Sequence, residues 1–186
     1  MQSVLLRSLS VAGLAFLAAC QDQHSDVSGP TSDGQVPTIT SSPSLTGGYS
    51  GTANAVLKTS FGYTKNYSCA VTATIGTQSG SSFSGTFAVV SSGDCGTFGS
   101  VGGTLTGTVQ EDGSLVVTAD TSDPGANIFE DAAARAGCTV VSTTGSLSGS
   151  FANGQWSASG SAVYDCPSDF GTIRVTADVT VSLAAA

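Results

Sequence analysis

Apolar and polar side chains alternate along most of the chain after residue 46. The alternation is clearest near the C-terminus, from Thr172 to Leu183, where every second residue is apolar and half of the others are threonine. Successive side chains of a β-strand point to opposite faces, so a period of two predicts a strand with one buried face. The apolar members of this segment are Ile173, Val175, Ala177, Val179, Val181 and Leu183.

The same pattern predicts about eight strands in the whole chain. They cover residues 47–58, 67–77, 82–90, 99–110, 114–121, 138–150, 155–164 and 171–184. Three links are short and carry residues that tolerate positive φ, at 78–80, 111–113 and 153–154. The other links are longer and cover residues 59–66, 91–98, 121–137 and 165–170. Because short and long links alternate between the two ends of a meander, we expect all the long loops at one end.

The fold class follows from this arrangement. We predict an all-β fold of about eight antiparallel strands in an up-and-down meander, closed into a small barrel, with a two-sheet sandwich as the alternative. One segment breaks the β pattern, because Ala126 to Arg135 is rich in helix formers. Its acidic residues come early, Arg135 comes late and Gly137 follows, as helix-dipole and C-cap preferences require. The sequence therefore predicts one short helix at the long-loop end.

Four cysteines in the predicted barrel form an internal repeat. Cys69 and Cys95 bracket one predicted hairpin, and Cys138 and Cys166 bracket another. The two ends of a hairpin come within disulfide reach, so we favour Cys69–Cys95 with Cys138–Cys166 over the other pairings. No pair has the close spacing of a zinc site, and the one histidine, His24, lies outside the strands. We therefore expect no metal and no cofactor.

The N-terminus has the features of a secretory signal. Arg7 precedes a mostly apolar run from Leu9 to Ala19, which is shorter than the ~20 residues of a spanning helix. The sequence Leu17-Ala18-Ala19-Cys20 resembles the lipobox of bacterial lipoproteins. This resemblance implies a signal peptide over 1–19, cleavage before Cys20, a diacylglyceryl group on its sulfur and a further fatty acyl group, such as palmitate, on its amine. The alternative is an ordinary signal peptide with Cys20 as an unpaired thiol.

The resemblance also bears on location. In bacterial lipoproteins an aspartate after the lipidated cysteine retains the protein at the inner membrane, whereas this chain has Gln21. We therefore expect a lipid anchor in the cell envelope, at the outer membrane if the host is Gram-negative. Residues 20–46 are mainly Ser, Asp, Pro, Gly and Thr, which predicts a disordered tether before a barrel domain over 47–186.

Charge and side-chain chemistry exclude several function classes. The chain has thirteen acidic and five basic residues and a net charge of −8, which is unsuited to binding nucleic acid. A hydrolytic triad needs a base beside its nucleophile, and the predicted barrel contains no histidine. Acidic pairs such as Glu130 with Asp131 lie in loops without aromatic platforms for a sugar. We therefore expect that the protein is not an enzyme.

The glycine- and threonine-rich strands carry a second resemblance. Segments such as Phe83 to Phe87 and Leu105 to Val109 are similar to strands of uncharacterised bacterial β-barrel lipoproteins, and more distantly to avidin-type and lipocalin-type barrels. The first resemblance implies no activity. Avidin-type sites use several tryptophans, whereas Trp156 is the only one here, and its place in the alternation indicates a core residue.

Two functions remain open. In the first, the barrel holds a small apolar or amphipathic ligand; in the second, a filled barrel acts as an interaction or structural module of the envelope through its long loops. A cavity above about 300 Å³ would favour the ligand. The tether enters at the short-turn end, so the long loops would face away from the membrane. The expected ligand or partner surface consists of Phe61, Tyr63, Phe98, Ile128, Phe129 and Phe170.

Overall fold

The structure is a computed structural model, which describes residues 41–92, 95, 101–122, 126–169 and 171–186. These residues form nine strands and one helix. The elements are β1 (Gly47–Thr59), β2 (Thr64–Ser79), β3 (Ser82–Val89), β4 (Val101–Val109), β5 (Ser114–Thr121), α1 (Ile128–Arg135), β6 (Thr139–Thr143), β7 (Leu147–Ala152), β8 (Gln155–Ser168) and β9 (Gly171–Ala185).

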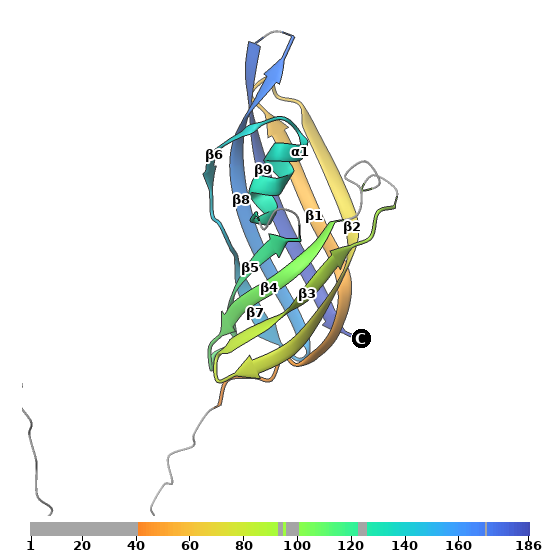
Figure 1. Ribbon diagram of the computed structural model, residues 1–186, viewed down its shortest axis with the longest axis vertical. Helices are drawn as coiled ribbons and strands as arrows, with labels where there is room; N and C mark the ends of the chain where they lie inside the picture. The colour runs from red at the N-terminus through yellow and green to blue at the C-terminus, as the bar shows by residue number, and fades with distance from the viewer. Residues whose placement is uncertain (1–40, 93–94, 96–100, 123–125, 170) are drawn as a thin grey trace, which may run out of the picture. The chain divides into compact units, whose positions relative to one another are not determined.

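Eight of the strands close into an antiparallel barrel (Figure 1). The order runs β7-β5-β4-β3-β2-β1-β9-β8 and returns to β7. Neighbouring strands are therefore consecutive in the chain, except that β6 is left out between β5 and β7 and that the first strand, β1, pairs with the last, β9. β6 is an additional strand that pairs only with β8. The predicted all-β meander, its closure into a barrel and the short helix are therefore confirmed.

The predicted strand over 138–150 is two strands rather than one. The segment is rich in Val, Ser and Thr throughout, but Gly145 takes a left-handed backbone conformation with φ 69°. Thr144 is hydrogen-bonded to Ser161 of β8 through both its backbone N–H, at 2.9 Å, and its hydroxyl. β6 and β7 therefore pair with successive parts of β8, and a period of two in the sequence does not reveal this interruption.

Two of the expected long loops are in fact the ends of long hairpins. β1 and β2 remain paired up to Lys58 and Thr64, and β8 and β9 up to Ser168 and Gly171. β2 begins at Thr64 and β8 ends at Ser168, beyond their predicted bounds at 67 and 164, and the added stretches carry mostly polar side chains. The links over 59–66 and 165–170 are consequently shorter than the sequence predicted.

The small barrel depends on glycines where neighbouring strands approach closely. A Cβ on Gly149 would lie 1.8 Å from the carbonyl oxygen of Ser157, and one on Gly103 would lie 1.9 Å from that of Asp120. Both glycines lie in the strands themselves, so a side chain at either position would push the adjacent strand away. This explains why glycines recur within strands of a tightly coiled sheet.

The barrel also includes residues that the sequence assigns to the tether. Leu45 is completely buried, and its N–H donates a 2.7 Å hydrogen bond to the side chain of Gln78. The amide of Gln78 in turn donates to the carbonyl oxygen of Pro43 at 2.8 Å. The structured domain therefore begins before residue 47, because an apolar side chain just ahead of β1 fills the end of the barrel that carries the short turns.

Candidate functional site

A cavity of about 200 Å³ lies inside the barrel. Every strand of the closed barrel contributes to its lining, and the lining side chains are almost all apolar. The wall includes Ala53 of β1, Leu105 of β4, Val117 of β5 and Val181 of β9. Protein interiors rarely leave voids larger than a water molecule, so a cavity of this size is a feature of the barrel and not ordinary packing.

An aromatic cluster closes the short-turn end of this cavity. The rings of Tyr49 and Phe83 stand edge-on to Trp156, with centroids 5.2 and 6.4 Å from that of the indole. Phe151 stands edge-on to Tyr49 at 6.5 Å. Among the described residues, no group accepts a hydrogen bond from the buried Nε1 of Trp156. The cluster and Leu45 together close the short-turn end of the barrel, and Trp156 is a core residue as expected.

A second cavity, of about 270 Å³, lies at the other end, beneath α1. Its lining includes Phe129 and Ala133 of the helix, Tyr164 of β8 and Ala177 of β9. The linings of the two cavities share the residues Ala55, Ile128 and Val179. The cavities are therefore adjacent, and Ile128 at the start of α1 borders both.

The helix fills a gap in the barrel wall. β5 pairs with β7 only over Ser114–Val117. The rest of β5 does not pair with β6, so the sheet is open between these two strands. α1 contacts both of these strands. Asn127 caps the helix by accepting a 3.0 Å hydrogen bond from the N–H of Phe129, and its amide donates to the carbonyl oxygen of Gly145. The helix is thus held at its first turn over the opening.

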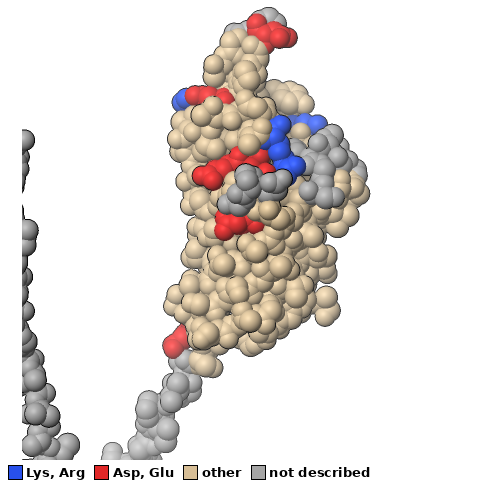
Figure 2. All heavy atoms as spheres, viewed as in Figure 1, with Lys and Arg blue, Asp and Glu red and all other residues tan. Residues whose placement is uncertain are grey.

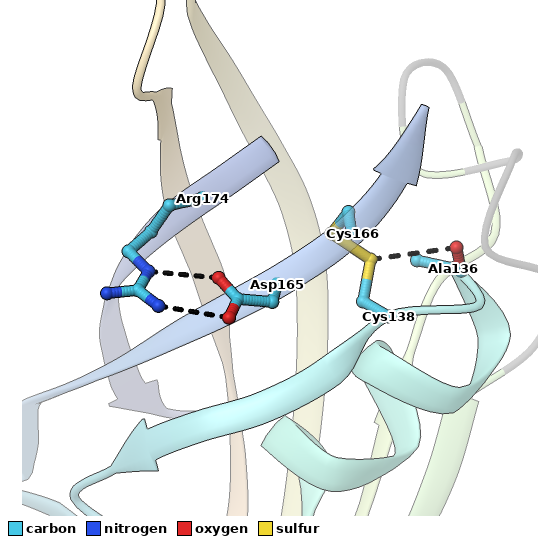
Figure 3. The surroundings of a disulfide bond; sticks show 5 residues. All are labelled: Ala136, Cys138, Asp165, Cys166 and Arg174. Atoms are coloured by element: carbon cyan, nitrogen blue, oxygen red, sulfur yellow. Dashed lines mark hydrogen bonds and ion pairs between the residues drawn. A yellow bond between two sulfur atoms is a disulfide. The ribbon is translucent and has the colours of Figure 1, made fainter. Parts of the chain in front are cut away.

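The disulfides are Cys69–Cys95 and Cys138–Cys166, which confirms the predicted pairing. Cys138 follows the helix and Cys166 lies within β8, so this bond holds the C-terminal end of α1 to the barrel wall (Figure 3). The sulfur of Cys138 lies 3.6 Å from the carbonyl oxygen of Ala136, a contact without a proton because a disulfide sulfur carries none. Cys69 and Cys166 lie inside strands and not at strand ends, because β2 and β8 are longer than predicted.

A bidentate ion pair lies next to this disulfide (Figure 3). Nε of Arg174 donates to Oδ1 of Asp165, and the terminal nitrogen donates to Oδ2, both at 2.9 Å. The hydrogen bonds from Arg174 lower the pKa of Asp165 below its usual value. The two residues are cross-strand partners on β8 and β9, so the pair ties together the hairpin that projects beyond the barrel.

The charged side chains that the structure describes lie outside the walls of the two cavities. Figure 2 shows them mainly over the part of the domain that carries α1, while the body of the barrel in this view is largely uncharged. Of the described residues that line either cavity, none is charged. No group of three metal-ligating side chains occurs within the described ranges, and no described helix has the length and apolar character to span a membrane.

Tyr164 is one of the polar residues that the structure adds to the candidate site, together with Tyr67 in the second cavity and Asn54 in the central one. Tyr164 is 6% exposed, and no described residue hydrogen-bonds to its hydroxyl. Desolvation by burial raises the pKa of Tyr164 to about 12. Tyr164 was not among the expected site residues, although the alternation that starts at Trp156 places it on the inner face of the same strand.

The expected surface residues fall into three groups. Phe61 and Tyr63 are exposed as predicted, by 75% and 64%, in the turn between β1 and β2. The expectation that Phe129 is exposed is wrong: it is 2% exposed, because the first turn of α1 points this ring into the barrel, and Ile128 is half-buried beside it. Phe98 and Phe170 lie outside the described residues, as does Cys20.

Comparisons with known proteins identify no family. No protein-family model matches the chain, and no curated protein is similar to it at a significant level. The chain is similar to a solved structure described as a redesigned beta barrel, with 11% sequence identity and a TM-score of 0.35, over 74% of this chain and 90% of the other. A likeness this distant indicates no function.

Proposed function

We propose that this protein is a lipid-anchored envelope protein whose barrel binds one small apolar molecule in its interior. The observation that carries the proposal is the central cavity of about 200 Å³ with its apolar lining. An apolar cavity of ~150 Å³ is already large enough to stay dry and bind benzene. Filling such a space with ligand atoms recovers contacts that its walls otherwise lack.

The central cavity alone is smaller than the volume of about 300 Å³ expected of a ligand pocket. The adjacent cavity of about 270 Å³ under α1 changes this comparison, because the two share wall residues. The residues common to both walls are Ala55, Ile128 and Val179, so a ligand could extend from one cavity into the other. We therefore favour ligand binding over a filled barrel.

The anchor is part of the proposal. Leu17-Ala18-Ala19-Cys20 supports lipid on Cys20, and two or more acyl chains give stable attachment where one is marginal. Leu45, the start of β1 and the short turns lie at one end of the barrel, and α1 lies towards the other. With the tether leading into the first end, α1 and the second cavity would face away from the membrane.

The test compares two variants in which phenylalanine replaces an alanine, one inside the barrel and one outside it. Ala53 lines the central cavity, whereas Ala70, on the adjacent strand, is exposed outside. In the whole chain with Cys20→Ser, which needs no detergent, Ala53→Phe should abolish binding of naphthalene and retention of a small molecule in native mass spectrometry. Ala70→Phe should change neither. Failure of the parent protein to bind naphthalene or retain any small molecule would refute the proposal.

The second candidate, an interaction module, rests on the exposure of Phe61 and Tyr63 in one turn. Aromatic residues of this kind are typical interface hot spots. Phe61→Ser with Tyr63→Ser should then reduce cross-linking of the anchored protein to an envelope partner, while Val116→Ser, an exposed residue on β5, should not. Equal cross-linking by both variants and the parent would exclude this function.

A further inference from the structure

We propose that the ligand is a single unbranched aliphatic chain with one uncharged polar group, which extends through both cavities and places that group at the hydroxyl of Tyr164. This inference rests on the proposed function and adds the chemical class of the ligand. It follows from how the two cavities adjoin, from the absence of charge in their walls and from one buried hydroxyl.

The shape of the space favours a chain. The central cavity reaches Leu183 near the short turns, and the second reaches Val175 near the far end of the same strand. The eight residues from one to the other span about 26 Å of strand at ~3.3 Å per residue. Neither cavity alone suits a drug-sized compact molecule, so a ligand that uses both must be long and narrow.

Ile128 is the constriction in this path. It is half-buried at the first position of α1, and it lines both cavities together with Ala55 and Val179. Ile128 has the longest of these three side chains, so we take it as the group that has to turn for the two cavities to join. A chain can pass such a constriction, whereas a ring system that fills one cavity cannot.

The walls specify an uncharged ligand. Within the described residues no cation lines either cavity. The nearby Arg174 and Arg135 are paired with Asp165 and Asp131, and Lys65 lies over the ring of Tyr67, 4.7 Å from its centroid. Burying a carboxylate without a partner is strongly unfavourable. A free fatty acid would therefore have to bind in its protonated form, which favours an alcohol or ester over an acid.

Tyr164 supplies the polar contact. Tyr164 is 6% exposed as a residue and lines the second cavity, and no hydrogen bond joins its hydroxyl to another described residue. A ligand hydroxyl or ester oxygen could therefore pair with it, and such a hydrogen bond contributes about 1 kcal/mol. Nε1 of Trp156 is the buried side-chain donor without a partner among the described residues, and it lies within the aromatic cluster, where neighbouring rings surround the indole.

The test is a binding series with the whole chain carrying Cys20→Ser. The probes are n-alkanols of increasing length, the n-alkanoates of equal length, and naphthalene as a compact molecule. Each buried methylene contributes ~0.8 kcal/mol, so alkanol affinity should rise about fourfold per added methylene past the length that fills the central cavity. Alkanoates should bind more weakly than alkanols of the same length at neutral pH.

Two substitutions assign the contacts. Tyr164→Phe should weaken alkanol binding about three- to tenfold and leave naphthalene unchanged, whereas Tyr63→Phe, in the exposed turn, should change neither. In Ile128→Trp, alkanol affinity should no longer rise with chain length, while naphthalene still binds. Val141→Trp, at an exposed position of β6, is its control, and thermal unfolding checks that each variant is folded.

The outcomes separate this inference from the proposed function. If naphthalene binds but alkanol affinity stops rising at the length of the central cavity, or alkanoates bind as tightly as alkanols, the inference is wrong and the proposed function stands. If Tyr164→Phe binds the alkanols as tightly as the parent protein does, the position of the polar group is wrong. If neither naphthalene nor any alkanol binds, both proposals fail.

Discussion

The hydroxyl of Tyr49 donates a 2.8 Å hydrogen bond to the carbonyl oxygen of Leu45, and both residues are buried at the short-turn end of the barrel. The residue before β1 is therefore joined to the aromatic cluster that closes the cavity. Burial raises the pKa of Tyr49, so the hydroxyl remains a donor at neutral pH.

Leu45→Ala should lower the free energy of unfolding by about 2–5 kcal/mol, because it leaves a cavity in place of a fully buried side chain. Tyr49→Phe should cost about 1 kcal/mol through the lost hydrogen bond. Urea denaturation measures both, with Tyr63→Phe in the exposed turn as the control. A Leu45→Ala variant as stable as the parent would mean that residues 43–46 are not part of the folded domain.

Gly149→Ala should destabilise the barrel by about 1–3 kcal/mol or more, since its new methyl group would meet the backbone of β8. Gly76 is the matched control, because a Cβ there meets no atom within 4 Å. Thermal unfolding of the two variants gives the comparison. Equal midpoints for both would show that the strands do not need to approach so closely at Gly149.

Loss of the Cys138–Cys166 bond, in the paired Cys138→Ser and Cys166→Ser variant, should cost about 3 kcal/mol by the chain-entropy estimate. The structural effect should be local, because this bond holds the C-terminal end of α1 to β8. Hydrogen exchange should rise in α1 while β3 retains its protection. Faster exchange that is uniform across the barrel would contradict a helix held in place by this bond.

Alkaline pH should destabilise the protein through Tyr164. Its folded pKa of about 12 exceeds the unfolded value of 10.0, so the folded state holds the phenolic proton more tightly. The associated stability is complete below about pH 10 and is lost as pH rises from about 10 towards about 12. Tyr164→Phe should show a shallower loss of stability over this window than Tyr63→Phe, as measured by urea denaturation at each pH. Equal slopes would mean that the phenol is not buried.

Cys20→Ser should release the protein from membranes, because the apolar run before it is too short to span them. Fractionation of the expressing cells measures the effect. A mutant that still sediments with membranes after a high-salt wash would show that the lipid anchor is not what holds the protein.

Much of the fold could be predicted because a half-buried strand repeats every two residues. β9 follows the predicted alternation, and Asn153 and Gly154 take positive φ, as their hairpin turn requires. The candidate site could not be predicted in this way. A cavity is the volume that side chains leave unfilled, and it depends on where α1 directs Ile128 and Phe129, which the helical pattern does not determine.

The two disulfides enclose separate stretches of chain, since Cys95 comes before Cys138. In a polypeptide that crosses a membrane from its N-terminus, Cys69 would meet Cys95 before either later cysteine had emerged. Oxidation in order of appearance would then yield the native bonds directly, without reshuffling of mispaired thiols. Cys138 and Cys166 enclose β6, β7 and most of β8, so the predicted hairpin repeat is not present, but the order of the four cysteines is the same. That order would let an exported chain form its native bonds where an oxidase is present and no disulfide isomerase is at hand.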